Sequence, residues 1–386
     1  MRRLVALALP GGPAFVEHLR RVWDAGDAVL PVDVRLGGPA RELLLAATRP
    51  ACVVDDAAPD ERPLRGAEPV EEGDALVMAT SGTTGDPKGV VLTHAAVAAS
   101  ARATSARLAV DGATDAWWAC LPLSHVGGLS VVTRSLVGGV RCEVVAGFSE
   151  EGATAALDGG ATLTSLVPTT LRRLHPEIAA GFRRIVLGGQ APPAGLAPNV
   201  VATYGMTETG SGLVYDGRPL DGVDVRIVDG EVHVRGPMLL RAYRDGSDPK
   251  DADGWLATGD AGQIGASGRL WVHGRLSEMI ISGGENIWPA AVEAVALRHP
   301  AVVEVGVAGV PDAEWGERVV AYVVVSPAAH VTVERLLAEL RDLVRADIAT
   351  YAAPRQVIVV ESLPRTTLGK VRRDGLGALQ GQSAGL

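Results

Sequence analysis

The sequence predicts an α/β protein with a large N-terminal α/β domain and a small α+β C-terminal domain. Up to about residue 205, apolar strand-like runs alternate with segments of helical spacing, which is the pattern of a largely parallel sheet. Over residues 212–274, short β-type runs are separated by Gly, Pro and Asp turns, which indicates a β-rich subdomain. From Pro289 on, the order helix, strand, strand, helix, strand is typical of a separate compact domain.

The elements follow from periodicity and from the residues that interrupt it. Residues 4–9 form an apolar run that Pro10 cuts short, so we favour a strand over a signal peptide. Phe15, Leu19 and Val22 repeat at helical spacing until Gly26 ends the helix. Further strands are expected over residues 28–34, 74–80, 116–121, 161–167, 184–187, 200–204, 223–228, 231–234, 270–273, 302–310, 319–325 and 357–360, and further helices over 291–298 and 333–346. We expect domains of residues 1–276 and 277–386, with the β-rich subdomain at about 210–274.

Composition excludes several classes of function. The chain of 386 residues has a formal net charge of −9 without a block of like charge, which argues against nucleic acid and anionic membranes as partners. No apolar stretch reaches the ~20 residues that span a bilayer. Three widely spaced cysteines without a CxxC pair favour neither a disulfide framework nor a zinc site. We therefore expect a cytoplasmic enzyme, and the sequence leaves a homo-oligomer open.

Lysine is almost absent from the basic residues of this chain. Of 36 Lys and Arg residues only three are lysines, namely Lys88, Lys250 and Lys370. Arginine supplies the generic positive charge, so a retained lysine indicates a position that needs a compact ammonium group on a flexible stem. Lys88 and Lys370 both follow glycine- and threonine-containing segments, whereas Lys250 lies in a turn and is expected to be a solvated surface residue.

The segment around Lys88 is a candidate phosphate-binding loop. Directly after a predicted strand it contains Thr80, Ser81, Gly82, Thr83 and Thr84. Backbone N–H groups and hydroxyls of such a loop can face a phosphate chain, with Lys88 as the counter-charge. The spacing differs from that of a Walker A loop, and a flexible surface loop is the plain alternative.

Residues 81–89 resemble the signature loop of the adenylate-forming superfamily, which contains acyl-CoA synthetases, peptide-synthetase adenylation domains and luciferases. Four further motifs follow in the order of that superfamily. Residues 203–208 resemble its adenine and magnesium motif, 255–260 its ribose motif, 274–286 its hinge motif and 364–370 its C-terminal lysine motif. The resemblance covers nearly the whole chain and implies ATP and Mg²⁺ as cofactors.

The resemblance also implies roles for the residues of the adenine and magnesium motif. Tyr204, which Gly205 follows, would stack on adenine with its flat apolar face. Thr207 would bond the α-phosphate, and Glu208 would hold Mg²⁺, which prefers carboxylate and phosphate oxygens. The plain alternatives are a core tyrosine at a strand end and a solvated glutamate in a turn.

Three other segments complete the sites that the resemblance implies. Asp260 would accept both ribose hydroxyls, and Arg275 would reach the ribose or the phosphates; the alternatives are a turn aspartate and an inter-domain salt bridge. The segment with Gly188, Gly189 and Gln190 would bring its backbone close to adenine and the acyl group. The segment with Ser282, Gly283 and Gly284 would line the CoA channel. Each of the two could equally be a plain tight turn.

The resemblance assigns the catalytic charge to Lys370, which would bridge the α-phosphate and the attacked carboxylate. Attack on the α-phosphorus brings two anions together, so a mobile cation lowers the barrier. The small domain would swing about a hinge at Ser277 between adenylation and thioester formation. Many members of the superfamily have aspartate at the hinge, and Ser277 departs from that pattern.

Residues 125–134, 164–168 and 204–222 resemble the o-succinylbenzoate–CoA ligases of menaquinone synthesis, whose short form also matches this chain in length. This resemblance implies CoA as co-substrate and a dicarboxylic acid whose second carboxylate needs donors in the pocket. His125 would border the acyl pocket, with a structural histidine as the alternative. Candidate donors are Ser130, Thr164, Ser165 and Arg134. An arginine at this spacing is as often a surface or interface residue.

Two other classes of function stay open. Other acyl- or aryl-CoA ligases and stand-alone carboxylate-adenylating enzymes share the core motifs, so only the pocket discriminates among them. A nucleotide-binding module without catalysis is the remote alternative, and the retention of Lys370 and Glu208 argues against it. An amino-acid adenylation domain is disfavoured because no aspartate for an α-amino group follows closely after His125.

Overall fold

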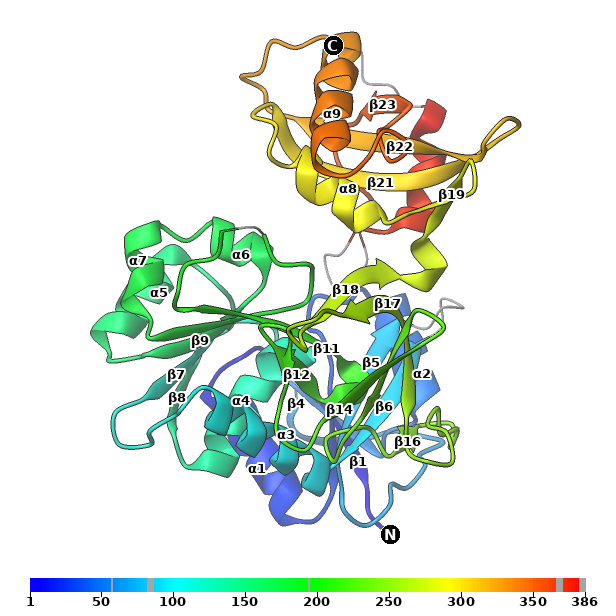
Figure 1. Cartoon of the computed structure of the whole chain (residues 1–386). Helices are drawn as coiled ribbons and strands as arrows, with labels where there is room; N and C mark the ends of the chain where they lie inside the picture. The colour runs from blue at the N-terminus through cyan, green and yellow to red at the C-terminus, as the bar shows by residue number, and fades with distance from the viewer. Residues whose placement is uncertain (57, 82–86, 194, 366–370, 382–386) are drawn as a thin grey trace. The chain divides into compact units, whose positions relative to one another are not determined.

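The computed structural model describes residues 1–56, 58–81, 87–193, 195–365 and 371–381. Within these ranges the chain folds into two compact units (Figure 1). The larger unit consists of Met1–Arg226, His233–Ala257 and Gly265–Leu270, and the smaller unit of Ile227–Val232, Thr258–Ile264 and the chain from Trp271 on. Both units combine helices with β-sheets, which confirms the predicted α/β class.

The first sheet of the larger unit is built mainly from the N-terminal part of the chain. Its strands are β1 (Leu4–Ala8), β2 (Ala28–Pro31), β3 (Cys52–Asp55), β4 (Ala58–Pro63), β5 (Asp74–Ser81), β6 (Pro87–Thr93) and β16 (Ala242–Tyr243), in the order β16-β6-β5-β2-β1-β3-β4. The pairing is parallel from β5 to β3 and antiparallel at both edges. β1 and β2 are buried along their whole length, as expected for parallel strands covered on both faces.

The second sheet is also parallel at its centre. It contains β7 (Ala116–Ala119), β8 (Arg141–Val144), β9 (Leu163–Leu166), β10 (Arg184–Leu187), β11 (Val200–Met206), β12 (Ser211–Tyr215) and β13 (Arg218–Pro219), in the order β13-β12-β11-β10-β9-β7-β8. β12 pairs antiparallel with both β11 and β13, and the other described pairs of this sheet are parallel. The sequence predicts one sheet where the structure has two, because alternation of strands and helices indicates the type of each element but not which strands pair.

Helices connect these strands. They are α1 (Pro13–Asp24), α2 (Gly38–Thr48), α3 (His94–Arg107), α4 (Val126–Gly138), α5 (Glu150–Asp158), α6 (Pro168–Arg172) and α7 (Pro176–Gly181). α3 and α4 pack against each other. The Thr93 hydroxyl caps α3 by accepting a hydrogen bond from the backbone N–H of Ala96, and Ser149 caps α5 in the same way. Among the described residues, no helix is long and apolar enough to span a membrane.

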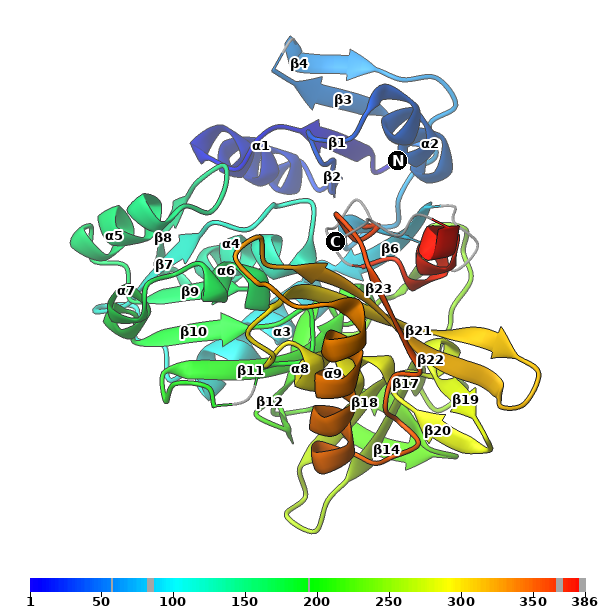
Figure 2. The ribbon, with the colours of Figure 1, turned by 90° about the horizontal axis from the view of Figure 1, so that it is seen from above.

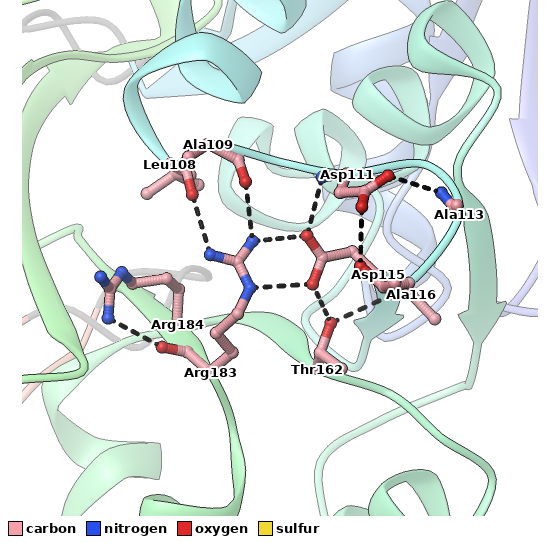
Figure 3. A network of polar contacts seen from close by, with 10 residues as sticks. Leu108, Ala109, Asp111, Ala113, Asp115, Ala116, Thr162, Arg183 and Arg184 are labelled. Carbon is pink, nitrogen blue, oxygen red and sulfur yellow. Dashed lines mark hydrogen bonds and ion pairs between the residues drawn. The ribbon is translucent and has the colours of Figure 1, made fainter.

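An ion pair with a buried carboxylate and a partly exposed arginine ties the loop before β7 to the start of β10 (Figure 3). The nearly buried Asp115 carboxylate accepts hydrogen bonds from Arg183 Nη2 at 2.5 Å and Nε at 2.9 Å, and from Thr162 Oγ1 at 2.6 Å. Arg183 also donates to two backbone carbonyl oxygens just after α3. Burial alone would raise the pKa of Asp115, but these hydrogen bonds, above all those from Arg183, hold it below its ordinary value.

Replacing Arg183 by methionine should lower the free energy of unfolding at pH 7 by about 3–5 kcal/mol, because the Asp115 carboxylate would stay buried without its partner. The stability that Asp115 contributes is present above its unfolded pKa of about 3.9. It is lost as the pH falls through the lower folded pKa. The difference in free energy of unfolding between wild type and variant should therefore be smaller below about pH 4 than at pH 7. Urea unfolding of both proteins at the two pH values measures this difference. Arg102→Met, on the exposed surface of α3, is the control, and equal destabilisation by both changes would contradict this account.

The β-rich stretch contains a four-stranded sheet in the order β14-β15-β17-β18, with β14 (Asp224–Val228), β15 (Glu231–Arg235), β17 (Leu256–Ile264) and β18 (Leu270–Arg275). β14, β15 and β18 confirm the predicted β-type runs. β17 escapes prediction because its glycines and aspartate have low strand propensity.

After Pro289 the smaller unit has the predicted order of elements. They are α8 (Pro289–Ala296), β21 (Val302–Asp312), β22 (Gly316–Val325), α9 (Val333–Asp347) and β23 (Gln356–Val359), and the hairpin of β19 (Ile280–Ser282) and β20 (Glu285–Ile287) extends the sheet. α8 and α9 contact each other beside this sheet (Figure 2). Leu336, Leu340 and Val344 recur every four residues on α9 and are fully buried in the core of this unit.

Candidate active site

The candidate phosphate loop joins β5 to β6, which form an antiparallel hairpin that the sequence does not predict. Thr80 pairs with Lys88, and Ser81 with Pro87. Thr80 Oγ1 donates to the carbonyl oxygen of Lys88 at 3.5 Å, and the Lys88 side chain is exposed. The pairing therefore presents Lys88 at the end of a sheet strand. The other predicted loop residues, which lie outside the described ranges, are Gly82, Thr83 and Thr84.

The adenine and magnesium motif is a tight hairpin between β11 and β12. Its turn is the 3-10 helix η1 (Thr207–Thr209), which carries Thr207 and Glu208. A Cβ atom on Gly205 would lie 2.2 Å from the carbonyl oxygen of Ser211, so only glycine allows the two strands to approach this closely. Tyr204 is half-buried near the end of β11. The structure thus places Tyr204, Thr207 and Glu208 on one short hairpin.

Glu208 is the candidate magnesium ligand. Its Oε1 accepts a hydrogen bond from Tyr243 Oη at 3.1 Å, and its backbone oxygen accepts one from the N–H of Leu240 at 2.7 Å. Across the described part of the chain, no group of three His, Cys, Asp or Glu residues could hold a metal ion. A single carboxylate nevertheless fits Mg²⁺, which keeps several waters and binds through one or two carboxylates together with substrate phosphates. Glu208 therefore suits a magnesium ion that arrives with a nucleotide.

The predicted adenine turn follows β10 and lies beside the end of β11, because these two strands pair in parallel. A Cβ atom on Gly188 would lie 2.8 Å from Thr203 Oγ1, and Gly189 has a φ of +87°. Gly189 and Gln190 are exposed. Ligands of open α/β sheets bind outside the carboxyl ends of the strands, which is where this turn and Tyr204 lie.

Arg134 is the largest charged side chain in the core of the larger unit. It lies on α4 and is 2% exposed. Its Nη1 lies 3.4 Å from Ser165 Oγ on β9, its Nη2 donates to Ser211 Oγ on β12 at 2.5 Å, and its guanidinium lies 5.6 Å from the ring centroid of Trp117. Within the described residues no carboxylate pairs with it, and its Nε is buried without a hydrogen-bond partner. The sequence predicts Arg134 and Ser165 as pocket residues but not Ser211, although Ser211 lies in the stretch 204–222.

The other predicted pocket residues lie on two elements, Ser130 on α4 and Thr164 and Ser165 on β9. Ser130 is buried one helical turn before Arg134 and, with Thr133, lines a small cavity between α3 and α4. The Thr164 hydroxyl donates to the carbonyl oxygen of Trp118 at 3.0 Å. Thr164 and Ser165 are consecutive on β9, so their side chains point to opposite faces of the sheet. Ser165 is thus the hydroxyl of this pair that meets Arg134.

His125 directly precedes α4 and lies near Asp33, a residue that the sequence does not predict as part of the site. His125 Nε2 lies 3.8 Å from Asp33 Oδ2. Asp33 also accepts hydrogen bonds from Arg35 Nε at 2.8 Å and Nη2 at 2.6 Å. Burial would raise the pKa of Asp33, but the hydrogen bonds from Arg35 and the proximity of His125 lower it. Asp33 therefore stays ionised beside His125.

In the smaller unit the two predicted ribose residues contact each other. Arg275 Nε lies 2.9 Å from Asp260 Oδ1, and Arg275 Nη1 donates to the carbonyl oxygen of Thr258 at 2.9 Å. Asp260 is 7% exposed, whereas Arg275 is exposed. The ion pair orients the Asp260 carboxylate.

The hinge motif continues through the 3-10 helix η2 (Leu276–Glu278) into a hairpin. Ser277 is exposed in η2, and Ser282 is 3% exposed at the end of β19. Gly283 and Gly284 form the two-residue turn to β20 with φ values of +61° and +84°, the conformation that favours Gly-Gly in a hairpin. A Cβ atom on Gly283 would also lie 2.8 Å from the Trp315 ring.

Lys370 lies outside the described residues, but both flanks of its segment are described. Arg365 forms an ion pair with Glu304 at 2.6 Å and an antiparallel bridge with Val371. The N–H of Arg372 donates to the carbonyl oxygen of Pro364 at 2.8 Å. The first two residues of the lysine motif, Pro364 and Arg365, are therefore held beside Val371 and Arg372.

Lys250 does not behave as the sequence predicts. Its Nζ donates to the carbonyl oxygens of Leu240 at 2.8 Å and Arg241 at 2.9 Å, and to Asp248 at 2.7 Å. The side chain is 18% exposed, so the expectation of a solvated surface residue is wrong. The turn brings Lys250 back over backbone carbonyls of its own segment, a contact that local sequence does not reveal.

The fold is that of adenylate-forming enzymes. Family models of the AMP-binding enzyme and of the AMP-binding enzyme C-terminal domain match residues 55–244 and 291–370. The chain belongs to the AMP-binding enzyme family.

Relatives and solved structures agree with this assignment. A probable 2-succinylbenzoate–CoA ligase of Mycobacterium tuberculosis is 38% identical over 88% of this chain and 93% of its own length. A 2-succinylbenzoate–CoA ligase of Enterococcus faecalis is 36% identical over 78% of this chain and 69% of its own length. The o-succinylbenzoate CoA synthetase of Bacillus subtilis, solved in complex with an acyl-adenylate intermediate, is 30% identical and superimposes with a TM-score of 0.85 over 97% of this chain and 88% of its own.

Proposed function

We propose that this protein is an AMP-forming acid–thiol ligase that joins o-succinylbenzoate to CoA through an acyl-adenylate, a step of menaquinone biosynthesis. The observation that carries the substrate assignment is Arg134, a buried guanidinium that Ser165 and Ser211 orient and that no carboxylate neutralises among the described residues. A second carboxylate on the substrate would form a charge-assisted pair with it. The similar proteins named above are ligases of such an acid.

The proposed reaction has two halves. A substrate carboxylate oxygen attacks the α-phosphorus of ATP and pyrophosphate leaves; the CoA thiol then attacks the acyl carbon and AMP leaves. In the larger unit, Lys88 would counter the phosphate charge, Thr207 would bond the α-phosphate, Tyr204 would stack on adenine and Glu208 would hold Mg²⁺. Bound Mg²⁺ supplies charge neutralisation at the phosphates.

The remaining assignments complete the proposal. His125 would border the acyl group, and the backbone of Gly188–Gln190 would approach adenine. Asp260 and Arg275 would bind the ribose, and Lys370 would carry the catalytic charge. We further propose Ser277 as the hinge at the boundary between residues 1–276 and 277–386, and the turn at Ser282–Gly284 as a wall of the CoA channel.

The test is pyrophosphate release from ATP and Mg²⁺ with o-succinylbenzoate, benzoate, succinate, a medium-chain fatty acid and several amino acids, each with and without CoA. We expect turnover only with o-succinylbenzoate, completed to a thioester by CoA. Turnover confined to another acid would keep the ligase mechanism and reject the substrate. No pyrophosphate release with any of these acids, together with measurable ATP binding, would favour a nucleotide-binding module without catalysis.

Replacing Glu208 by glutamine should reduce turnover and raise the Mg²⁺ concentration needed for half-maximal activity by about 10–100-fold, because an amide binds a hard cation less well than a carboxylate. Initial rates over a Mg²⁺ series at saturating ATP measure this. Glu143→Gln, on the edge strand β8, is the matched control. Normal Mg²⁺ dependence of Glu208→Gln would reject the metal assignment.

Location and assembly complete the proposal. We place the enzyme in the cytoplasm, where the three free cysteines, Cys52, Cys120 and Cys142, would remain reduced. A homo-oligomer is compatible with the proposed function. Light scattering of the purified protein measures the molar mass in solution and so gives the number of subunits.

A further inference from the structure

We infer that Tyr243 is a positioning residue that ties the phosphate-loop lysine to the magnesium-binding glutamate; this inference rests on the proposed function. Tyr243 Oη donates a hydrogen bond to Glu208 Oε1 at 3.1 Å. Lys88 Nζ lies 5.1 Å from the centroid of the Tyr243 ring. One side chain therefore contacts both charged groups, the glutamate through its hydroxyl and the lysine through its ring.

The backbone around Tyr243 joins the same two elements. Tyr243 pairs with Val90 on β6, two residues after Lys88. The N–H of Leu240 donates to the backbone oxygen of Glu208 at 2.7 Å. The segment from Leu240 to Tyr243, which ends in the short strand β16, thus bridges the hairpin that carries Lys88 and the turn that carries Glu208, although these residues are far apart in the sequence.

Gly89 permits this bridge. A Cβ atom on Gly89 would lie 2.8 Å from Val77 Cγ1 and 2.9 Å from the Cβ of Arg244, the residue after Tyr243. The N–H of Arg244 donates to the carbonyl oxygen of Gly89 at 2.7 Å. The absence of a side chain next to Lys88 is therefore what allows β16 to pack against β6.

Three basic side chains anchor the segment that bears Tyr243. Arg241 binds the fully buried Asp74 carboxylate through Nε and Nη2, each at 2.9 Å. Arg244 donates to three backbone carbonyl oxygens at the end of α2 and in the loop before β5. Lys250 donates to the carbonyl oxygens of Leu240 and Arg241. A segment held this firmly can fix the direction of the Tyr243 side chain.

The two contacts have different chemical consequences. A hydrogen bond to a ligating carboxylate fixes the orientation of that carboxylate, and losing such a partner typically costs 10–100-fold in metal affinity. In the part of the chain that the structure describes, Glu208 Oε2 accepts no hydrogen bond from a side chain, so the Tyr243 bond leaves this oxygen for a cation. The face of an aromatic ring attracts an ammonium group, so the ring restricts where Lys88 can lie.

Two substitutions separate these contacts. Tyr243→Phe removes the hydroxyl and keeps the ring, whereas Tyr243→Leu removes both. We would titrate Mg²⁺ into each protein with α,β-methylene ATP and measure nucleotide binding by calorimetry. Tyr243→Phe should raise the Mg²⁺ concentration at half-saturation by about 10–100-fold and leave Mg²⁺-free nucleotide affinity unchanged. Tyr243→Leu should also weaken binding at saturating Mg²⁺, because Lys88 loses the ring.

Controls distinguish positioning from general damage. Tyr351→Phe, at an exposed tyrosine of the smaller unit, should match wild type, and melting curves without ligand should show every variant folded. In a Glu208→Gln background, Tyr243→Phe should have no further effect on Mg²⁺-dependent binding. An unchanged Mg²⁺ half-saturation in Tyr243→Phe, or an effect that persists without Glu208, would overturn the inference. If wild type itself shows no Mg²⁺-dependent nucleotide binding, the proposed function fails and this inference fails with it.

Discussion

Replacing Lys370 by alanine should slow acyl-adenylate formation by about 10²–10³-fold, the loss that follows removal of one preorganised charge from a reaction site. The carboxylate and the α-phosphate are both anionic, and the ammonium group offsets their repulsion as the new bond forms. Thioester formation from added adenylate should stay near the wild-type rate, because a neutral or anionic thiol then attacks an already activated acyl carbon. Pyrophosphate release reports the first half-reaction, and thioester formation from synthetic adenylate reports the second.

Two further variants sharpen this test. Lys370→Arg keeps the charge but replaces a compact ammonium by a broad planar group, so we expect it to recover only part of the lost rate. Arg345→Ala removes a cation from the surface of α9 and should leave both half-reactions unchanged. Equal loss of both half-reactions in Lys370→Ala would refute the role assigned to this lysine.

Replacing Arg134 by methionine should reduce kcat/KM for o-succinylbenzoate by a factor equivalent to about 2–5 kcal/mol, the usual loss when one partner of a buried charge pair is removed. The same change should affect 4-oxo-4-phenylbutanoate much less, because that acid lacks the aromatic carboxylate. The melting temperature should not fall, since methionine fills the site without the desolvation cost of a buried guanidinium that no carboxylate neutralises among the described residues. Steady-state kinetics with both acids and a thermal melt measure these effects.

The conservative variant tests the geometry of the guanidinium. Arg134→Lys keeps a positive charge but cannot bridge Ser165 and Ser211 while presenting two parallel N–H groups to a carboxylate. We expect kcat/KM for o-succinylbenzoate between those of wild type and Arg134→Met. If Arg134→Met lowers kcat/KM equally for both acids, Arg134 supports the fold of the pocket and does not recognise the second carboxylate.

Much of the local structure was predictable from the sequence. The strands at β1 and β10 and the helix α1 lie where periodicity places them, because each has a strongly apolar face or run. The order of elements after Pro289 is likewise confirmed. Several strands were missed, and two of them, β6 and β17, contain Gly, Pro, Lys or Asp. Only pairing with neighbours in the sheet makes these residues extended.

The motifs and their order were readable because chemistry restricts which residues a phosphate, a metal or a carboxylate requires. The sequence by itself determined the family, the α/β class and the identity of Lys88, Glu208 and Arg134 as charged groups worth testing. Only the tertiary structure decided that two sheets form, that Lys250 anchors backbone carbonyls, and that Tyr243 joins Lys88 to Glu208. The sheet pairing and the Tyr243 contacts join residues far apart in the chain, and a local pattern does not specify which distant surfaces pack together. The Lys250 contacts depend on how its own segment folds back on itself.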